Sequence, residues 1–311
     1  MHKVDHPLLY YLRHLNLNKT YKIRKNSCEL CERKSSRTIR EIIDIGAGCF
    51  GYFPVVSCNF CGFIYQKFRF EKNFYNDYYK WFYRKMVCKQ VRPHRSFIKD
   101  QISRGKILLN NIKHLLADRG NLLDVGCSSG GMMKAFMQIG WKCMGTDPDQ
   151  GFVKFGKKFL KIPIQEVAAE KMNLKSNHYD LIIIMGSLEH VFDPNKVLSL
   201  CRKASKPNGL LLLEGRGNPQ NESKKYFNHN HHRYLSLVSM KLFMKKHGWN
   251  PILATSKLLT GPTRKGGIYC LGRASKKLPK KRFQAWLKKQ PKESSSKILY
   301  KFNSLDKKEK L

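Results

Sequence analysis

The sequence predicts an α/β protein in which a Rossmann-like parallel sheet follows a small zinc ribbon. Three observations lead to this prediction. Strand-like and helix-like segments alternate from about residue 97, which implies a parallel sheet covered by helices on both faces. A glycine-containing turn, DVGCSSGG, ends the first of these strands. Before residue 70, four cysteines stand in two C-x2-C pairs. With 41% hydrophobic residues, the 311-residue chain can build the cores that both parts need.

The cysteine pairs are Cys28-Glu-Leu-Cys31 and Cys58-Asn-Phe-Cys61. A C-x2-C turn lets two thiolates bind one Zn²⁺, and two such turns complete a tetrahedral shell. Four thiolate ligands leave no open coordination position, so the expected Zn²⁺ is structural. The alternative is that these four cysteines are unrelated and simply buried. For the six single cysteines elsewhere in the chain, packing in the core is the interpretation that we prefer.

The sheet domain begins with a helix, expected over residues 96–120 from apolar residues at helical spacing. Buried strands are expected in NLLDV, WKCMGTD, YDLIIIMG and GLLLLEG, and helices in GGMMKAFMQIG and QGFVKFGKKFL. SMKLFMKKHGWNPILATSK and GGIYCLGRA then predict a last helix and a closing β-hairpin.

A nucleoside site is expected where these strands end, because ligands bind parallel sheets at the carboxyl ends of the strands. Gly126 and Gly130 flank a turn in which backbone can approach a ligand closely. Asp147 ends the next strand, where a carboxylate can accept both ribose hydroxyls. Taken singly, the glycines fit an ordinary turn and Asp147 fits a helix N-cap. Their combination favours a nucleoside ligand.

DVGCSSG resembles motif I of class I S-adenosylmethionine-dependent methyltransferases, and the resemblance extends over about residues 95–273. It includes GTDPD, YDLIIIMGSLEHVFDP and KPNGLLLLEG, in that order. It implies a seven-stranded sheet with a closing antiparallel hairpin and S-adenosyl-L-methionine as cofactor. It also implies that Asp124 helps to hold the methionine ammonium, Asp147 the ribose, and that Glu170 lies near the adenine. The implied cofactor-binding residues are Asp124, Gly126, Ser128, Gly130, Asp147, Glu170 and Ser187.

The zinc ribbon, the aromatic stretch FYNDYYKWFYRK and the following domain together resemble the zinc-binding sugar methyltransferases. That family implies transfer of a methyl group to a sugar, linked to a nucleotide or contained in a surface glycan or glycolipid. The expected organisation is an N-terminal segment (1–20), the zinc ribbon (21–70), a helical linker or lid (71–118), the methyltransferase domain (119–273) and a basic tail (274–311).

Residues 229–236, HNHHRYLS, match the H-E-H-x-x-Y-F-S pattern of the family's carbon-methylating members, with Asn230 at the carboxylate position. Because an amide cannot accept a proton at neutral pH, this departure favours methylation of oxygen, for which one imidazole suffices as general base. We expect His231 to be that base and His229 to be the second candidate. The alternatives are phosphate binding, helix capping, a metal site, or a base from the pair Glu189-His190.

The net charge of +38 favours a phosphorylated or nucleotide-linked sugar as acceptor, with weak electrostatic contact to an anionic membrane or RNA left open. Fourteen Lys/Arg against three Asp/Glu fall in residues 273–311, a tail expected to be partly helical at best and otherwise solvated. No apolar run is long enough to span a membrane and no signal peptide is recognised, so we expect a cytoplasmic protein, peripheral at the inner membrane surface at most. Three other functions remain open: an RNA methyltransferase, a sugar C-methyltransferase, and a non-catalytic zinc-ribbon interaction protein.

Overall fold

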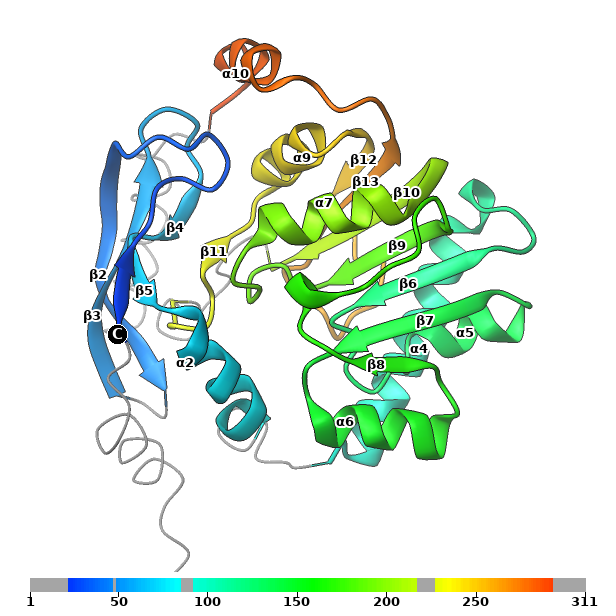
Figure 1. Cartoon of the computed structure of the whole chain (residues 1–311). Coiled ribbons are helices and arrows are strands. Elements are labelled where there is room, and N and C mark those ends of the chain that lie inside the picture. The colour runs from blue at the N-terminus through cyan, green and yellow to red at the C-terminus, as the bar shows by residue number, and fades with distance from the viewer. Residues whose placement is uncertain (1–21, 47–48, 85–91, 217–226, 293–311) are drawn as a thin grey trace, which may run out of the picture.

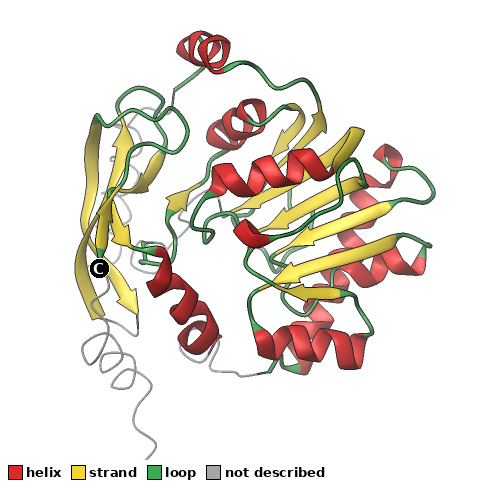
Figure 2. Ribbon diagram, in the orientation of Figure 1, coloured by secondary structure: helices red, strands yellow, loops and turns green. Residues whose placement is uncertain are grey.

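The structure is a computed structural model that describes residues 22–46, 49–84, 92–216 and 227–292 (Figure 1). The expected N-terminal segment (1–20) and residues 293–311 of the expected tail lie outside the described residues. Two sheets face each other across a short helical segment, with the smaller sheet built mainly from the first seventy residues (Figures 1 and 2).

The larger sheet has seven strands in the order β12-β13-β10-β9-β6-β7-β8. All run parallel except β13, which pairs antiparallel with both β10 and β12. This is the class I methyltransferase arrangement with its closing antiparallel hairpin, as the sequence predicted. The strands are β6 (Asn121–Val125), β7 (Lys142–Asp147), β8 (Ile164–Glu166), β9 (Tyr179–Met185), β10 (Ser205–Gly215), β12 (Trp249–Thr255) and β13 (Ile268–Ala274).

Helices cover both faces of this sheet because its central strands are apolar on both sides. In β9, Leu181 and Ile183 face one core while Ile182 and Ile184 face the other. One face packs against α4 (Arg95–Ile112), α5 (Met133–Gln138) and α6 (Gln150–Phe155), which η3 (Gly156–Leu160) continues; the other packs against α7 (Pro194–Ala204) and α9 (Leu237–Lys246). Short 3-10 turns, η2 (Lys113–Leu115) and η4 (Ala169–Lys171), complete the connections.

The zinc ribbon forms a four-stranded sheet in the order β11-β4-β3-β2, with β2 (Ser36–Gly46), β3 (Cys49–Cys58) and β4 (Ile64–Gln66) from the ribbon itself. A two-stranded sheet joins β1 (Ile23–Lys25) to β5 (Phe68–Phe70). The fourth strand, β11 (Arg233–Tyr234), lies within residues 229–236, the histidine segment, and pairs antiparallel with β4 (Figure 1). The sequence did not predict this strand, which joins the ribbon to the loop that follows β10.

Between the two sheets lies the lid segment, residues 72–84, formed by α2 (Lys72–Asp77) and the π-helix η1 (Tyr78–Phe82). Phe74, Tyr75 and Tyr78 are buried and form a separate aromatic cluster with Phe82. Figure 1 shows this segment between the ribbon and the carboxyl ends of the large sheet's strands.

The sequence predicted a tail that is partly helical at best and otherwise solvated, and the start of this tail is a helix that packs on the rest of the protein. Residues Lys280–Lys288 form helix α10, whose Phe283 and Leu287 are buried in the core shared by α9 and the ribbon. These two apolar residues are four apart in sequence and therefore lie on one helix face. That spacing could have predicted that this helix packs on the protein. Among the helices of the described ranges, none is long and apolar enough to cross a membrane.

Candidate active site

The glycine turn after β6 is fixed by its backbone conformation and by Asp147. Gly126 has φ +76°, and a Cβ there would lie 2.6 Å from the Ser187 side chain, so a side chain is excluded twice over. The Ser128 N–H donates to Asp147 Oδ2 at 2.7 Å, and Ser128 itself has a φ of 57°. Asp147 also accepts a hydrogen bond from the Asp149 N–H at 2.9 Å. Its carboxylate therefore holds the turn after β6 against the end of β7.

Asp124 lies at the end of β6 with its carboxyl group buried, and its Oδ1 has no hydrogen-bond partner among the described residues. Burial, and then the charge of Asp147, raise the pKa of Asp124 to about 8. A buried carboxyl group that lacks a partner is costly, and an ammonium group from a ligand would supply both the donor and the opposite charge. These residues therefore fit the amino-acid end of S-adenosylmethionine.

A pocket of about 550 Å³ opens at these strand ends. Of the seven predicted cofactor-binding residues, Gly130 alone does not line it; a Cβ at Gly130 would meet Met133 and Ile162, so its role is packing. Glu170 Oε1 accepts hydrogen bonds from the backbone N–H groups of Phe192 and Asp193, and Ser187 Oγ donates to the Val125 carbonyl. Both side chains shape the pocket wall by holding neighbouring backbone.

The lid segment closes one side of the pocket with Tyr75, Tyr79, Tyr83 and Arg84. Arg84 Nη2 donates to Ser128 Oγ at 3.1 Å, and Arg84 Nε lies 3.5 Å from Asp149 Oδ2. The sequence predicted a linker or lid in this region but no role for Arg84. The position of Arg84, a cation at the end of an aromatic stretch, could have indicated one.

The histidine segment is not the pocket wall that we expected. His231 is half-buried and His229 is buried, and neither lines the pocket, whereas His190 after β9 does. His190 Nδ1 lies 2.9 Å from the Asn230 carbonyl oxygen, and since that oxygen can only accept, Nδ1 carries the proton. Burial, and then His231, lower the pKa of His190 well below its usual value. The ring is therefore neutral, with Nε2 as a proton acceptor.

His229 and Asn230 face the lid instead. The His229 ring packs against Tyr78 and Phe74, with centroids 4.7 and 5.7 Å away, and burial lowers the pKa of His229 to about 3. Asn230 Nδ2 donates to the Tyr78 hydroxyl at 3.4 Å. The position at which the carbon-methylating pattern has a carboxylate thus contacts the lid, and its backbone carbonyl orients His190.

The four predicted zinc ligands, Cys28, Cys31, Cys58 and Cys61, are buried and lie with all their Sγ atoms within 4.8 Å of one another. Cys28 Sγ lies 3.5 Å from Cys61 Sγ, and Cys31 Sγ lies 3.4 Å from Cys58 Sγ. A tetrahedral site with Zn–S bonds of 2.3 Å needs sulfurs about 3.8 Å apart, so the cluster fits a structural zinc ion. The two turns are alike: Glu32 and Gly62, each directly after the second cysteine, have φ values of 68° and 74°.

Glu29, inside the first zinc turn, forms a buried ion pair with two arginines. Its carboxylate lies 2.7 and 2.9 Å from Arg233 Nε and Nη2, and 2.9 Å from Arg69 Nη2. Burial alone would raise the pKa of Glu29, but the charges of Arg233 and then Arg69 lower it to about 2. Arg233 also donates to the Leu188 carbonyl, so one side chain links the zinc ribbon to the segment that contains His190.

The pocket end near His190 is basic. Arg216 and Arg264 line it, and Arg264 lies 3.4 Å from Glu214, a carboxylate that Arg104 already pairs at 2.9 Å. One carboxylate between two guanidinium groups leaves positive charge facing the pocket, which suits an anionic acceptor.

Comparison with known proteins identifies the domain. A family model described as a methyltransferase domain matches residues 97–254, just over half of the chain. The chain belongs to this methyltransferase family. The sequence motifs predicted a methyltransferase domain over about residues 95–273, and this match agrees with that prediction.

Curated relatives of the methyltransferase include ubiquinone biosynthesis O-methyltransferases. The one from Rhodopseudomonas palustris (strain BisA53) is 28% identical over 134 residues, 40% of this chain and 51% of that protein. The one from Bordetella avium is 32% identical over 102 residues, 30% of this chain and 41% of that protein. The chain thus spans about half the length of the curated relatives that it matches, or less.

Two solved structures are also similar. The 1,6-didemethyltoxoflavin-N1-methyltransferase of Burkholderia thailandensis is 11% identical, with a TM-score of 0.46, over 58% of this chain and 82% of that one. An S-adenosylmethionine-dependent methyltransferase from Aquifex aeolicus is 15% identical, with a TM-score of 0.44, over 59% of this chain and the whole of that one.

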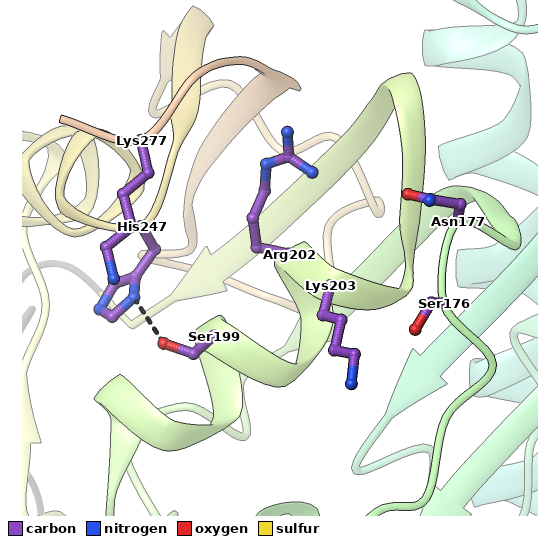
Figure 3. A pocket seen from close by; sticks show the side chains of 7 residues that line it. All are labelled: Ser176, Asn177, Ser199, Arg202, Lys203, His247 and Lys277. Carbon is purple, nitrogen blue, oxygen red and sulfur yellow. Dashed lines mark hydrogen bonds between the residues drawn. The ribbon is translucent and has the colours of Figure 1, made fainter.

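The methyltransferase has a second pocket at the opposite ends of the strands, between the end of α7 and the loop before β9 (Figure 3). His247 there contacts Ser199 Oγ at 3.2 Å and Asn195 Oδ1 at 2.9 Å, and Arg202 donates to the carbonyls of Gly248 and Ser275. These groups hold backbone and side chains of the fold, and none of them belongs to the cofactor pocket.

Proposed function

We propose that this methyltransferase transfers the methyl group of S-adenosylmethionine to a hydroxyl of a small phosphorylated or nucleotide-linked sugar, with His190 as general base. The main support is the placement of His190, a neutral imidazole on the pocket wall with Nδ1 held by the Asn230 carbonyl and Nε2 available. S-adenosylmethionine would supply an activated methyl group on a positively charged sulfur. Asp124 and Asp147 would hold its ammonium and ribose.

The protein's own groups then have two tasks. His190 Nε2 accepts the hydroxyl proton as the acceptor oxygen forms its bond to carbon, which contributes on the order of 10²–10⁴ in rate for a positioned base. Arg216 and Arg264 bind the phosphate of the acceptor and orient its hydroxyl toward the methyl group. This assignment replaces His231 and His229, neither of which lines the pocket.

We also propose one structural Zn²⁺ at Cys28, Cys31, Cys58 and Cys61. With four thiolate ligands it would stabilise the two turns, and it takes no part in the transfer.

A phenolic acceptor is a second candidate. Tyr75, Tyr79, Tyr83 and Phe192 line the pocket, and aromatic walls suit a ring as well as a sugar. The names of the curated relatives, which are O-methyltransferases of ubiquinone biosynthesis, support an oxygen acceptor but not a sugar in particular.

The test is methyl transfer from labelled S-adenosylmethionine to a panel of UDP-, GDP- and dTDP-linked hexoses, a simple catechol, and tRNA. Transfer to the oxygen of a nucleotide-linked hexose supports the proposal. Transfer to catechol alone would favour the second candidate, and transfer to tRNA alone would refute both.

For the base, the informative substitution is His190→Asn, whose amide N–H can keep the bond to the Asn230 carbonyl while Nε2 is lost. We expect kcat to fall by about 10²-fold or more with unchanged affinity for S-adenosylmethionine. His231→Asn is the matched control, with a much smaller loss expected. Full turnover in His190→Asn would rule His190 out as base.

A further inference from the structure

Arg233 connects three parts of the molecule that are far apart in sequence. Its side chain is fully buried, in β11 of the ribbon sheet. Two of its nitrogens bind the Glu29 carboxylate between the zinc-ligand cysteines, and Nη1 donates to the Leu188 carbonyl, two residues before His190. A planar guanidinium is suited to such a junction because its five N–H groups have fixed directions.

The backbone around Arg233 repeats the same connection. The His232 N–H donates to the Glu189 carbonyl at 2.9 Å, and His232 Nδ1 lies 3.1 Å from the Val191 carbonyl. On the ribbon side, the Gln66 N–H donates to the His232 carbonyl at 3.0 Å. The histidine segment is therefore bound on one edge to the ribbon and on the other to the segment that contains His190.

We propose that Glu29 and Arg233 are positioning residues for His190: the carboxylate in the first zinc turn holds Arg233, and Arg233 holds both backbone segments whose alignment keeps His190 Nδ1 on the Asn230 carbonyl. This inference rests on the proposed function, in which His190 is the base. It gives the ribbon a role in the reaction, because the turn that binds the metal also presents Glu29. Neither residue touches the cofactor pocket.

The ionic character of this junction is essential to the proposal. Glu29 is the counter-ion that the structure provides for both Arg233 and Arg69, and all three side chains are at most 8% exposed. Removing the carboxylate charge leaves two buried guanidinium groups close together without compensation, which is strongly unfavourable. The loop that presents Arg233 must then move to hydrate the charge.

Glu32 offers a matched control within the same turn. It also pairs with two cations, Lys246 and Lys280, but they belong to α9 and α10, and the Glu32 side chain is 48% exposed. The Glu29→Gln and Glu32→Gln variants therefore carry the same chemical change in the same turn, directly after Cys28 and Cys31 respectively. They differ in burial and in which part of the molecule loses its ionic partner.

The experiment compares wild type, Glu29→Gln and Glu32→Gln as full, zinc-loaded chains. The measurements are zinc content, affinity for S-adenosylmethionine, amide hydrogen exchange, and the ¹⁵N signals of the His190 ring, which report the tautomer. We expect Glu29→Gln to keep zinc and cofactor affinity, to exchange the His232 and Gln66 amides at least about tenfold faster, and to lose the single Nδ1–H tautomer of His190. Glu32→Gln should behave as wild type in every measurement.

Unchanged exchange and an unchanged tautomer in Glu29→Gln would overturn the inference, and so would the same change in Glu32→Gln. If Glu29→Gln fails to fold, Arg233→Lys decides, because it keeps the charge next to Glu29 but cannot reach the Leu188 carbonyl at the same time. Faster exchange of residues 188–191 in that variant supports the proposal, and wild-type exchange refutes it. None of these measurements needs turnover, so a failure of His190 as base, seen with His190→Asn, is distinguishable from a failure of Glu29 as positioning residue.

Discussion

The two halves of the pocket are built in different ways. The cofactor half is local: Asp124, the glycine turn and Asp147 come from two neighbouring, paired strands, and hydrogen bonds from backbone N–H groups to the Asp147 carboxylate fix the turn. The acceptor half is lined by the lid and by the segment after β9, which the histidine segment holds in place through hydrogen bonds, and it depends on a Glu29–Arg233 contact that spans 204 residues. The cofactor half can be recognised from a sequence motif because it is local. The acceptor half cannot, because it forms only when the ribbon is in place.

The largest effect should come from the metal site. Cys58→Ser is expected to lose zinc and to destabilise the ribbon and the histidine segment by several kcal/mol, since structural zinc in small domains supplies about 10 kcal/mol or more of binding energy to folding. Metal analysis and hydrogen exchange would measure this, together with retained binding of S-adenosylmethionine.

Cys201→Ser is the control, because Cys201 is a buried cysteine of α7 that does not belong to the group of four cysteines. It should keep zinc. If Cys58→Ser still binds one zinc per chain, the four-thiolate site is wrong; if it loses all cofactor binding, the two halves are not separable.

The halves should also respond to pH with opposite sign. The pKa of His229 is lowered to about 3 by burial, below its unfolded value, so its contribution to stability is present above pH 6.5 and is lost as pH falls toward 3. The pKa of Asp124 is raised to about 8 by burial and Asp147, so the ligand-free protein gains stability from this group as pH falls below 8. Each contribution amounts to about 2 kcal/mol between pH 7 and pH 5.

Urea unfolding of the ligand-free protein at both pH values tests this contrast. Between pH 7 and pH 5, Asp124→Asn should lose more stability than wild type, and His229→Phe should lose less. Equal pH dependence in the three proteins would contradict the assignment of these two groups.

A smaller effect is expected at the glycine turn. Gly126→Ala combines a left-handed backbone conformation with a Cβ 2.6 Å from Ser187, so the turn must shift and affinity for S-adenosylmethionine should fall by about tenfold or more. Gly140→Ala has a similar φ of +86°, but its Cβ would meet nothing nearer than 3.8 Å. It should lose about 1 kcal/mol of stability and no affinity, as titration calorimetry and thermal unfolding would show. Equal affinity in both variants would mean that the turn does not approach the cofactor.

The smallest effect belongs to the exposed side of the zinc turn. Lys280→Ala removes a partner of Glu32 that is 75% exposed, and the expected loss is at most about 1 kcal/mol because water screens such pairs. Thermal unfolding measures it. A loss as large as that caused by Arg233→Ala would erase the distinction between the exposed and buried carboxylates of this turn.

The sequence was sufficient for the seven-stranded fold and the grouping of the four cysteines, and six of the seven residues that it assigned to the cofactor line one pocket. Each of these features is encoded by neighbouring residues and short spacings. It placed His231 at the acceptor because a family pattern gives the order of residues but not the direction of their side chains. His190 was recognised only as a lower candidate, since its tautomer depends on a carbonyl forty residues away. The pairing of β11 with β4 had no local signal: two residues, Arg233 and Tyr234, are too few for a strand pattern.

Strand β11 also bears on the order of events during synthesis. The zinc ribbon emerges from the ribosome before the large sheet, yet its own sheet gains β11 only after β6 to β10 have been made. Contacts between residues so far apart in sequence form late, because the entropic cost of closing a long loop comes before any stabilisation from the contact. Metal loading and cofactor-pocket folding can therefore precede completion of the acceptor half, and a chain interrupted before residue 233 is expected to bind zinc without ever orienting its base.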